Sequence, residues 1–125
     1  MKILLDTHVY IWWLMQSPRL APQAIRRIEG ADMVYVSAAS IWEASIKTGT
    51  GKLRADVDDL QRKIALSQFI ELPVTARHAV ASAKLPLLHK DPFDRILVAQ
   101  AISEPLRLLT ADRRLASYSG LVDLL

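Results

Sequence analysis

The sequence predicts an α/β fold in which a central parallel sheet of four to five strands carries helices on both faces, in three layers. Short apolar runs typical of buried strands alternate with segments whose apolar residues recur at helical spacing. The runs occupy residues 2–5, 33–36, 70–74 and 107–110, and residues 122–125 are expected to add an edge strand. Because each strand is followed by a helix before the next strand, the connections are expected to be right-handed crossovers between parallel strands.

The composition is that of a single globular domain, which we expect to span residues 1–125. Hydrophobic residues make up 51% of the chain and charged residues 23%, and 125 residues are enough to bury a core without disulfides. The chain has no cysteine, which excludes thiolate chemistry and cysteine zinc sites and suits a reducing cytoplasm. The start lacks the apolar stretch of a signal peptide, and residues 9–15 are too short to span a bilayer. We therefore expect a cytoplasmic protein.

The charge balance is weakly basic. A net charge of +3 and a pI near 9.4 favour polyanionic partners, but they are equally compatible with a solubility role.

The first strand runs directly into a helix. Asp6 follows the strand, and a helical pattern continues to Met15. Pro22 starts a second helix that stops at Gly30. Asp6 therefore lies at the carboxyl end of a buried strand, which is where ligands bind in open α/β sheets.

The second strand leads into a helix that contains an acid. Ser37 and Ser40 are both candidate N-caps for a helix that includes Glu43 and ends at Gly49. A further helix, headed by first-turn acids, follows over residues 56–66.

The third strand precedes a helix from Thr75 to Lys84, and a more apolar helix comes after it. The pair Asp91-Pro92 predicts the start of this second helix, because proline tolerates the first helical position and aspartate is a good cap. The residues that follow are apolar almost all the way round, which indicates burial against a sheet. Asp94 is also a candidate partner of Asp91 in a capping box. After the fourth strand, Asp112 precedes a last helix.

Acidic residues come to one edge of the predicted sheet. Asp6 and Asp112 follow strands, while Glu43 and Asp94, with Asp91 beside it, lie in helices that start at the same edge. Carboxylates brought together repel unless a cation lies among them. Oxygen ligands without cysteine favour a hard ion, Mg²⁺ or Mn²⁺, and such ions serve phosphoryl chemistry.

Helix capping is the alternative explanation for each acid. Asp6, Asp91 and Asp112 each precede a helix, and Glu43 is placed to close a capping box with Ser40. The residue pattern alone leaves both explanations open. Histidine ligands are not expected, since no two of His8, His78 and His89 are paired at ligand spacing.

Several motifs follow one another through nearly the whole chain. They are Leu4-Leu5-Asp6-Thr7-His8, Ser37 to Glu43 with Lys47 and Gly51-Lys52-Leu53, His89 to Arg95 with Ala99-Gln100-Ala101, and Thr110-Ala111-Asp112. In these motifs and their order the chain resembles the PIN domains, and more narrowly the VapC-like toxin ribonucleases of bacterial type II toxin–antitoxin pairs. The Asp-Pro-Phe-Asp-Arg run is the most specific of them.

The resemblance implies a PIN-like fold and a role for each motif residue. It implies that Asp6, Glu43, Asp94 and Asp112 surround Mg²⁺ or Mn²⁺ and catalyse RNA hydrolysis. It also implies supporting positions for Asp91, Thr7 and Thr110. Cationic residues near these motifs are expected to hold flanking phosphates of RNA: Lys47, Lys52, Arg95 and Arg113.

The resemblance further implies a homodimer and a cognate antitoxin whose tail covers the acidic cleft. The tryptophans Trp12, Trp13 and Trp42 are expected to lie in the core or at such an interface. The alternative function is a non-catalytic PIN-fold module that binds RNA or protein without cutting it.

Overall fold

The computed structural model describes all 125 residues and is built on a parallel five-stranded sheet in the order β3-β2-β1-β4-β5. The strands are β1 (Lys2–Leu5), β2 (Met33–Ser37), β3 (Ile70–Leu72), β4 (Arg107–Thr110) and β5 (Val122–Leu124). The predicted parallel sheet and its edge strand β5 are confirmed. β3 stops at Leu72 and not at residue 74, because Pro73 has no N–H to continue the ladder.

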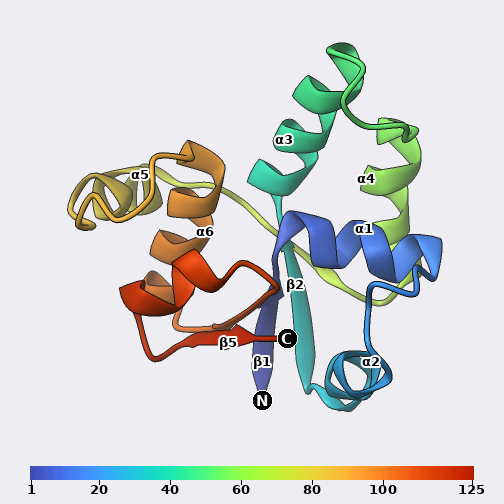
Figure 1. Ribbon diagram of the computed structural model, residues 1–125, viewed down its shortest axis with the longest axis horizontal. Helices are drawn as coiled ribbons and strands as arrows, with labels where there is room; N and C mark the ends of the chain where they lie inside the picture. The colour runs from blue at the N-terminus through green and yellow to red at the C-terminus, as the bar shows by residue number, and fades with distance from the viewer.

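Helices cover both faces of this sheet, as predicted. They are α1 (Thr7–Met15), α2 (Pro22–Gly30), α3 (Ala38–Gly49), α4 (Val57–Leu66), α5 (Ala76–Ala83), α6 (Pro92–Ser103) and the short 3₁₀ helix η1 (Arg113–Tyr118). α5 and α6 lie on one side of the sheet and α1, α2 and α4 on the other (Figure 1). The last predicted helix is thus a 3₁₀ helix of 6 residues with Leu115 as its one buried side chain; such helices are usually short because their hydrogen bonds are poorer.

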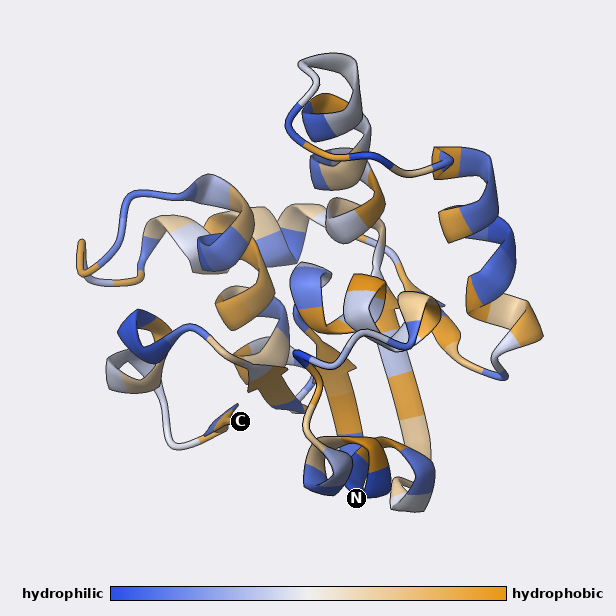
Figure 2. Ribbon diagram, turned by 45° about the vertical axis from the view of Figure 1, so that its right-hand side comes forward, coloured by the Kyte–Doolittle hydropathy of each residue, from blue (hydrophilic) through white to orange (hydrophobic).

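Alternation along the central strands explains why both faces are covered. Ile3 and Leu5 of β1 pack with α1, α2 and α4, whereas Leu4 points to the opposite face. In β4, Leu109 joins the first cluster and Leu108 joins the second, with α6. Successive side chains of a strand point to opposite faces, so an unbroken apolar strand must be buried on both. The central strands are accordingly hydrophobic in Figure 2.

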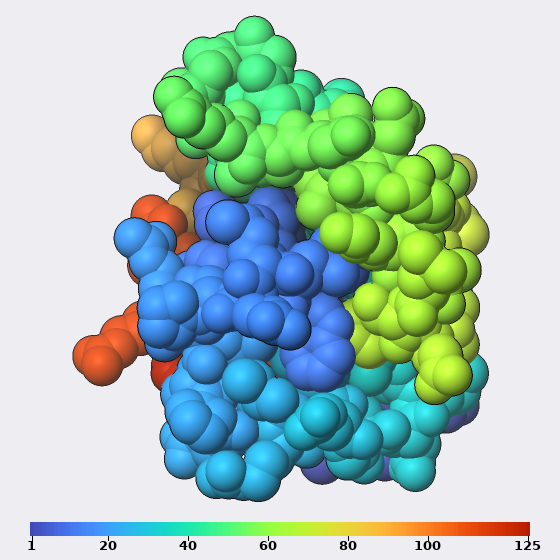
Figure 3. Space-filling model, turned by 90° about the vertical axis from the view of Figure 1, so that its right-hand side faces the viewer, coloured from blue at the N-terminus to red at the C-terminus, as the bar shows by residue number.

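The first helix is enclosed by its neighbours on the outer side of the molecule. The space-filling view shows α1 between α2 and the segment around residues 50–66 (Figure 3). The Tyr10 hydroxyl donates to the Leu60 carbonyl at 2.6 Å, so that α1 is tied to α4. None of the helices could span a lipid bilayer.

Candidate metal centre at the carboxyl edge of the sheet

An acidic cleft of about 430 Å³ lies at the carboxyl edge of the sheet. It lies at the ends of β1 and β4, beside α1, α3, α6 and η1. Its lining residues are Asp6, His8, Trp12, Arg19, Glu43, Lys47, Asp91, Asp94, Ala111, Asp112 and Arg114. The four acids expected at a metal site, together with Asp91, are therefore brought to one cavity.

Asp6 combines a capping contact with a place in the cleft. One carboxylate oxygen, Oδ1, accepts from the His8 N–H at 2.8 Å and caps α1. The other, Oδ2, accepts from the Thr110 hydroxyl at 2.6 Å. Burial raises the pKa of Asp6, with Glu43 adding to the rise, while the bonds from Thr110 and His8 act in the opposite direction. Capping and ligation are thus compatible for this residue, because each oxygen accepts one hydrogen bond and keeps a lone pair.

Glu43 is buried on α3 with one oxygen left unpartnered. Glu43 is one of the least exposed acidic residues, with 3% of its surface accessible to solvent. Oε2 accepts from the Lys47 ammonium at 2.6 Å, but Oε1 has no hydrogen-bond partner. An unsatisfied buried carboxylate oxygen is costly, so its presence in a cleft of acids favours a bound cation.

The capping box proposed for Glu43 is not formed. Ser37, at the end of β2, is the N-cap of α3 and accepts from the Ala39 N–H at 3.0 Å. Ser40 instead accepts from the Thr7 hydroxyl at 2.8 Å. Thr7 therefore joins α1 to α3 and makes no hydrogen bond to any of the four acids.

Asp91 and Asp94 have separate partners at the start of α6. Asp91 Oδ1 caps the helix by accepting from the N–H groups of Phe93, at 2.8 Å, and Asp94, at 3.2 Å. The Asp94 carboxylate lies 2.8 Å from His89 Nε2. Burial, followed by the charges of Asp91, Asp6 and Glu43, raises the pKa of Asp94 to about 6, although the bond with His89 lowers it.

Asp112 caps η1 and faces an arginine. Its Oδ1 accepts from the Arg114 N–H at 3.0 Å, and the Arg114 guanidinium donates to Oδ2 at 2.9 Å. These hydrogen bonds with Arg114 lower the pKa of Asp112. The Asp112 N–H donates to the Thr110 hydroxyl at 3.0 Å, so Thr110 contacts both Asp6 and Asp112, as a hydroxyl that orients these acids would.

The expected phosphate-binding residues are only partly brought together. Lys47 lines the cleft, whereas Lys52 and Arg113 are exposed outside it. Arg95 donates to the carbonyls of Ser82, at 2.8 Å, and Pro86, at 2.9 Å. Its guanidinium is thus engaged within the protein and is not among the groups that line the cleft.

Two cationic side chains line the cleft instead. Arg114 follows the expected Arg113 by one residue, and its guanidinium lies at the cleft through hydrogen bonds to Asp112. Arg19 comes from the connection between α1 and α2. No motif marks Arg19 in the sequence, because its place depends on how that connection folds back.

His89 also lies among the acids, contrary to the expectation that no histidine is placed for ligation. Its Nε2 is 2.8 Å from Asp94 and 3.9 Å from an oxygen of Asp112. These three residues form a group with geometry able to hold a metal ion. Spacing in the sequence could not reveal this group, because Asp112 follows β4 and is remote from His89 along the chain.

The donor set fits a divalent cation. Asp6 and Asp94 have raised pKa values and Glu43 has an oxygen without a partner. A cation among these groups would relieve the repulsion and satisfy the free oxygen. Carboxylate oxygens suit Mg²⁺ and Mn²⁺.

Comparisons with known proteins agree with this architecture. The model of the PIN domain family matches residues 3–121. The chain is 33% identical over 118 residues to Ribonuclease VapC22 of Mycobacterium tuberculosis, a match that covers 93% of this chain and 91% of that protein.

Solved structures share the fold at lower identity. VapBC2 from Rickettsia felis, bound to a DNA fragment from its promoter, matches with a TM-score of 0.70 at 17% identity and covers 99% of this chain and 97% of that one. DNA-bound VapBC from Salmonella typhimurium gives 0.67 at 18% identity, covering 96% and 94%. FitAcB from Neisseria gonorrhoeae gives 0.64 at 21% identity, covering 92% and 90%.

Proposed function

The chain belongs to the PIN-domain family, and on this premise we propose that it is a metal-dependent endoribonuclease acting as the toxin of a toxin–antitoxin pair. The observation that carries the proposal is the cleft lined by Asp6, Glu43, Asp94 and Asp112, in which Glu43 has an unpartnered buried carboxylate oxygen. The likeness to a named ribonuclease over 93% of the chain supports the same activity. The proposed reaction is hydrolysis of an RNA phosphodiester that leaves a 5′-phosphate and a 3′-hydroxyl.

The four acids would hold the cation, for which we propose Mg²⁺ or Mn²⁺. When bound, such an ion supplies an activated water nucleophile and neutralises charge on the phosphate. Thr110 holds the carboxylate of Asp6 and the backbone of Asp112 in place. Lys47 holds Glu43 through the bond to Oε2 and leaves Oε1 free for the site.

Substrate binding is assigned to the cations that line the cleft. Lys47, Arg19 and Arg114 line the cleft and would attract phosphates that flank the scissile bond. Single-stranded or loop RNA is the proposed substrate, because an unpaired backbone can be splayed into a cleft. Lys52 and Arg113, which are exposed beyond the cleft, would contact only more distant phosphates.

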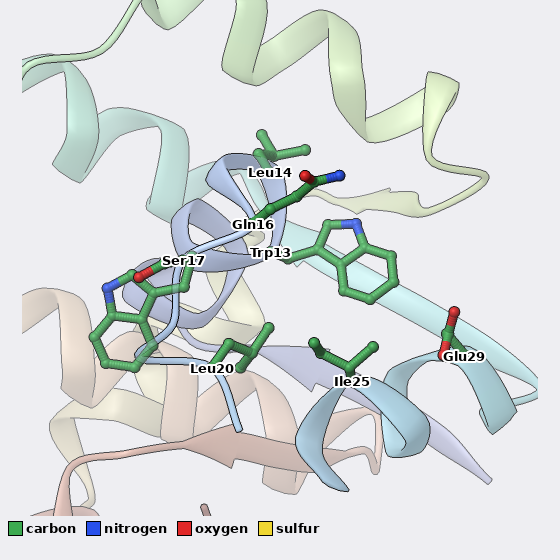
Figure 4. Close-up of a pocket in the computed structure, with 8 residues that line it drawn as sticks. Trp13, Leu14, Gln16, Ser17, Leu20, Ile25 and Glu29 are labelled. Atoms are coloured by element: carbon green, nitrogen blue, oxygen red, sulfur yellow. The ribbon is translucent and has the colours of Figure 1, made fainter. Parts of the chain in front are cut away.

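We also propose an antitoxin partner, a homodimer and a cytoplasmic location. Support for the antitoxin comes from an apolar hollow of about 560 Å³ between α1 and α2, where Trp13, Leu20 and Ile25 point toward one another (Figure 4). Trp12 lines both this hollow and the acidic cleft. A partner segment bound in the hollow would therefore reach the acids, which suits an inhibitory tail.

The test is cleavage of total RNA by antitoxin-free protein with Mg²⁺, with Mn²⁺ and with a chelator. Asp94→Asn should remove cleavage, because it takes a carboxylate from the cleft. Asp58→Asn is the matched control, since Asp58 is an exposed first-turn acid of α4 that does not line the cleft. It should cut like the wild type.

Two results would argue against the enzyme. Cleavage that persists in Asp94→Asn or with chelator would contradict the proposed chemistry. RNA bound but left intact by metal-loaded protein would support the alternative, a PIN-fold binding module.

A further inference from the structure

The geometry points to His89 as a nitrogen ligand of the cation at the acidic cleft: it forms a mixed nitrogen and oxygen triad with Asp94 and Asp112, which line the cleft, and lies directly behind them. The inference rests on the proposed function, since it takes this cleft to be the cation site. It adds a ligand of a different chemical type to the four carboxylates, and it predicts which ion the site prefers.

The positions of the three donor atoms carry the inference. Nε2 of His89 lies 2.8 Å from Asp94 Oδ2 and 3.9 Å from Asp112 Oδ2, and one ligand atom from each residue lies within 4.8 Å of the others. Ligand bonds of about 2.1 Å place neighbouring donors about 3 Å apart and opposite donors about 4.2 Å apart. The two distances from His89 are within a few tenths of an ångström of this range before any adjustment.

The charges around the triad leave Asp94 without a permanent cationic partner. Glu43 is paired with Lys47 and Asp112 with Arg114, but Asp94 contacts only His89. Separately, Glu43 lines the same cleft, is 97% buried and has an unpartnered Oε1. Asp94 and Glu43 thus each favour a bound cation. In the metal-free structure His89 Nε2 is in hydrogen-bond contact with Asp94; with the proton on Nδ1 instead, the ring would offer the Nε2 lone pair to a cation shared with that carboxylate.

His89 is also held in place, as a ligand should be. The Tyr118 hydroxyl accepts from the His89 N–H at 2.9 Å and from Arg95 Nη1 at 3.2 Å. Arg95 in turn donates to the carbonyls of Leu85 and Pro86, at 3.2 and 2.9 Å. Arg95 and Tyr118 thus hold the segment between α5 and α6 in place and position His89 beside the acids. This explains why the arginine of the Asp-Pro-Phe-Asp-Arg run is absent from the cleft wall.

A nitrogen ligand changes the expected metal preference. Imidazole suits transition-metal ions, whereas Mg²⁺ favours an all-oxygen environment. The wild type should therefore bind Mn²⁺ more tightly than Mg²⁺. His89→Gln should weaken Mn²⁺ binding by about tenfold and should change Mg²⁺ binding much less.

The test is pulsed electron paramagnetic resonance on the full chain loaded with Mn²⁺, without RNA or antitoxin. Coordination by imidazole gives a ¹⁴N modulation from the directly bound nitrogen. We expect this modulation in the wild type and its loss in His89→Gln. His8→Gln is the matched control, because His8 lines the same cleft with its Nδ1 3.8 Å from Asp6 but is 55% exposed. That variant should keep the modulation.

The outcomes separate this inference from the proposed function. Bound Mn²⁺ without ¹⁴N modulation, or a modulation lost in His8→Gln and kept in His89→Gln, would overturn the ligand assignment and leave the metal site standing. No Mn²⁺ binding at all would overturn both. If His89→Gln does not fold, ¹⁵N-labelled histidine in the His8→Gln background replaces it. The other histidine in this background, His78, is buried and its Nε2 contacts Glu104. A ¹⁵N signal from a metal-bound histidine would therefore come from His89.

Discussion

The Thr110 hydroxyl donates to Asp6 Oδ2 at 2.6 Å across a sequence separation of 104 residues. The bond joins the carboxyl ends of β1 and β4, which are adjacent strands of the sheet. Because the same hydroxyl accepts from the Asp112 N–H, one side chain orients two acids of the cleft.

Thr110→Val should weaken both the fold and the site. The side chain is fully buried, and valine keeps its shape but leaves the Asp6 oxygen without its donor. We expect a loss of about 1–3 kcal/mol in the free energy of unfolding, measured by urea denaturation. The pKa of Asp6 should rise further, since the Thr110 bond lowers it. Thr110→Ser keeps the hydroxyl and should lose much less stability; equal losses in the two variants would contradict a role for the bond.

Asp94→Asn should stabilise the metal-free protein at pH 7 while it removes cleavage. The folded-state pKa of about 6 lies above the ordinary value of 3.8, so holding Asp94 ionised in the fold opposes folding at neutral pH. Removing that charge should raise the free energy of unfolding by about 1–3 kcal/mol. The gain should shrink as the pH falls through 6 toward 4, because wild-type Asp94 then takes up its proton. Denaturation with chelator at pH 7 and pH 4.5 checks the sign, and a gain independent of pH would contradict it.

Mn²⁺ should stabilise the wild type and should stabilise Glu43→Gln much less. Glutamine removes the charge of the one acid with an unpartnered buried oxygen. A ligand at about 100 times its dissociation constant adds about 2.7 kcal/mol to the free energy of unfolding. Thermal unfolding with increasing Mn²⁺ measures the effect, and Asp58→Asn should behave like the wild type. The same metal-induced rise in both variants would remove Glu43 from the site.

Arg114→Gln should weaken RNA binding, whereas Arg113→Gln should change it little. The two residues are neighbours in η1, but only Arg114 lines the cleft. Loss of one phosphate contact should reduce the slope of log affinity against log salt concentration by about 1. Fluorescence anisotropy with single-stranded RNA over a salt series, in the presence of Ca²⁺ to limit cleavage, provides the measurement. Equal slopes for both variants would place the phosphates elsewhere.

Arg95→Ala should act on stability and not directly on RNA contacts. The guanidinium binds the carbonyls of Ser82 in α5 and of Pro86 between α5 and α6, together with the Tyr118 hydroxyl. Its loss should lower the free energy of unfolding by about 2–3 kcal/mol, as measured by urea denaturation. The salt slope of RNA binding should stay unchanged. A reduced slope with unaltered stability would instead support the phosphate contact expected from the motif.

The sequence by itself determined the sheet and the convergence of the acids. Apolar runs with alternating helices require parallel strands, and parallel strands bring residues such as Asp6 and Asp112 to one edge. Local signals were also enough to predict that α6 starts at Asp91-Pro92, since helix starts depend on neighbouring residues.

Only the tertiary structure decided where the cationic side chains and His89 lie and which groups they contact. Arg95 and Arg114 are both near the motifs, yet one binds carbonyls inside the protein and the other faces the cleft. The choice between Ser37 and Ser40 as cap depended in the same way on the hydroxyl of Thr7, which is 33 residues from Ser40. The physical reason is that long or hydroxyl-bearing side chains bind whichever partners the fold brings within reach, and those partners come from distant parts of the chain.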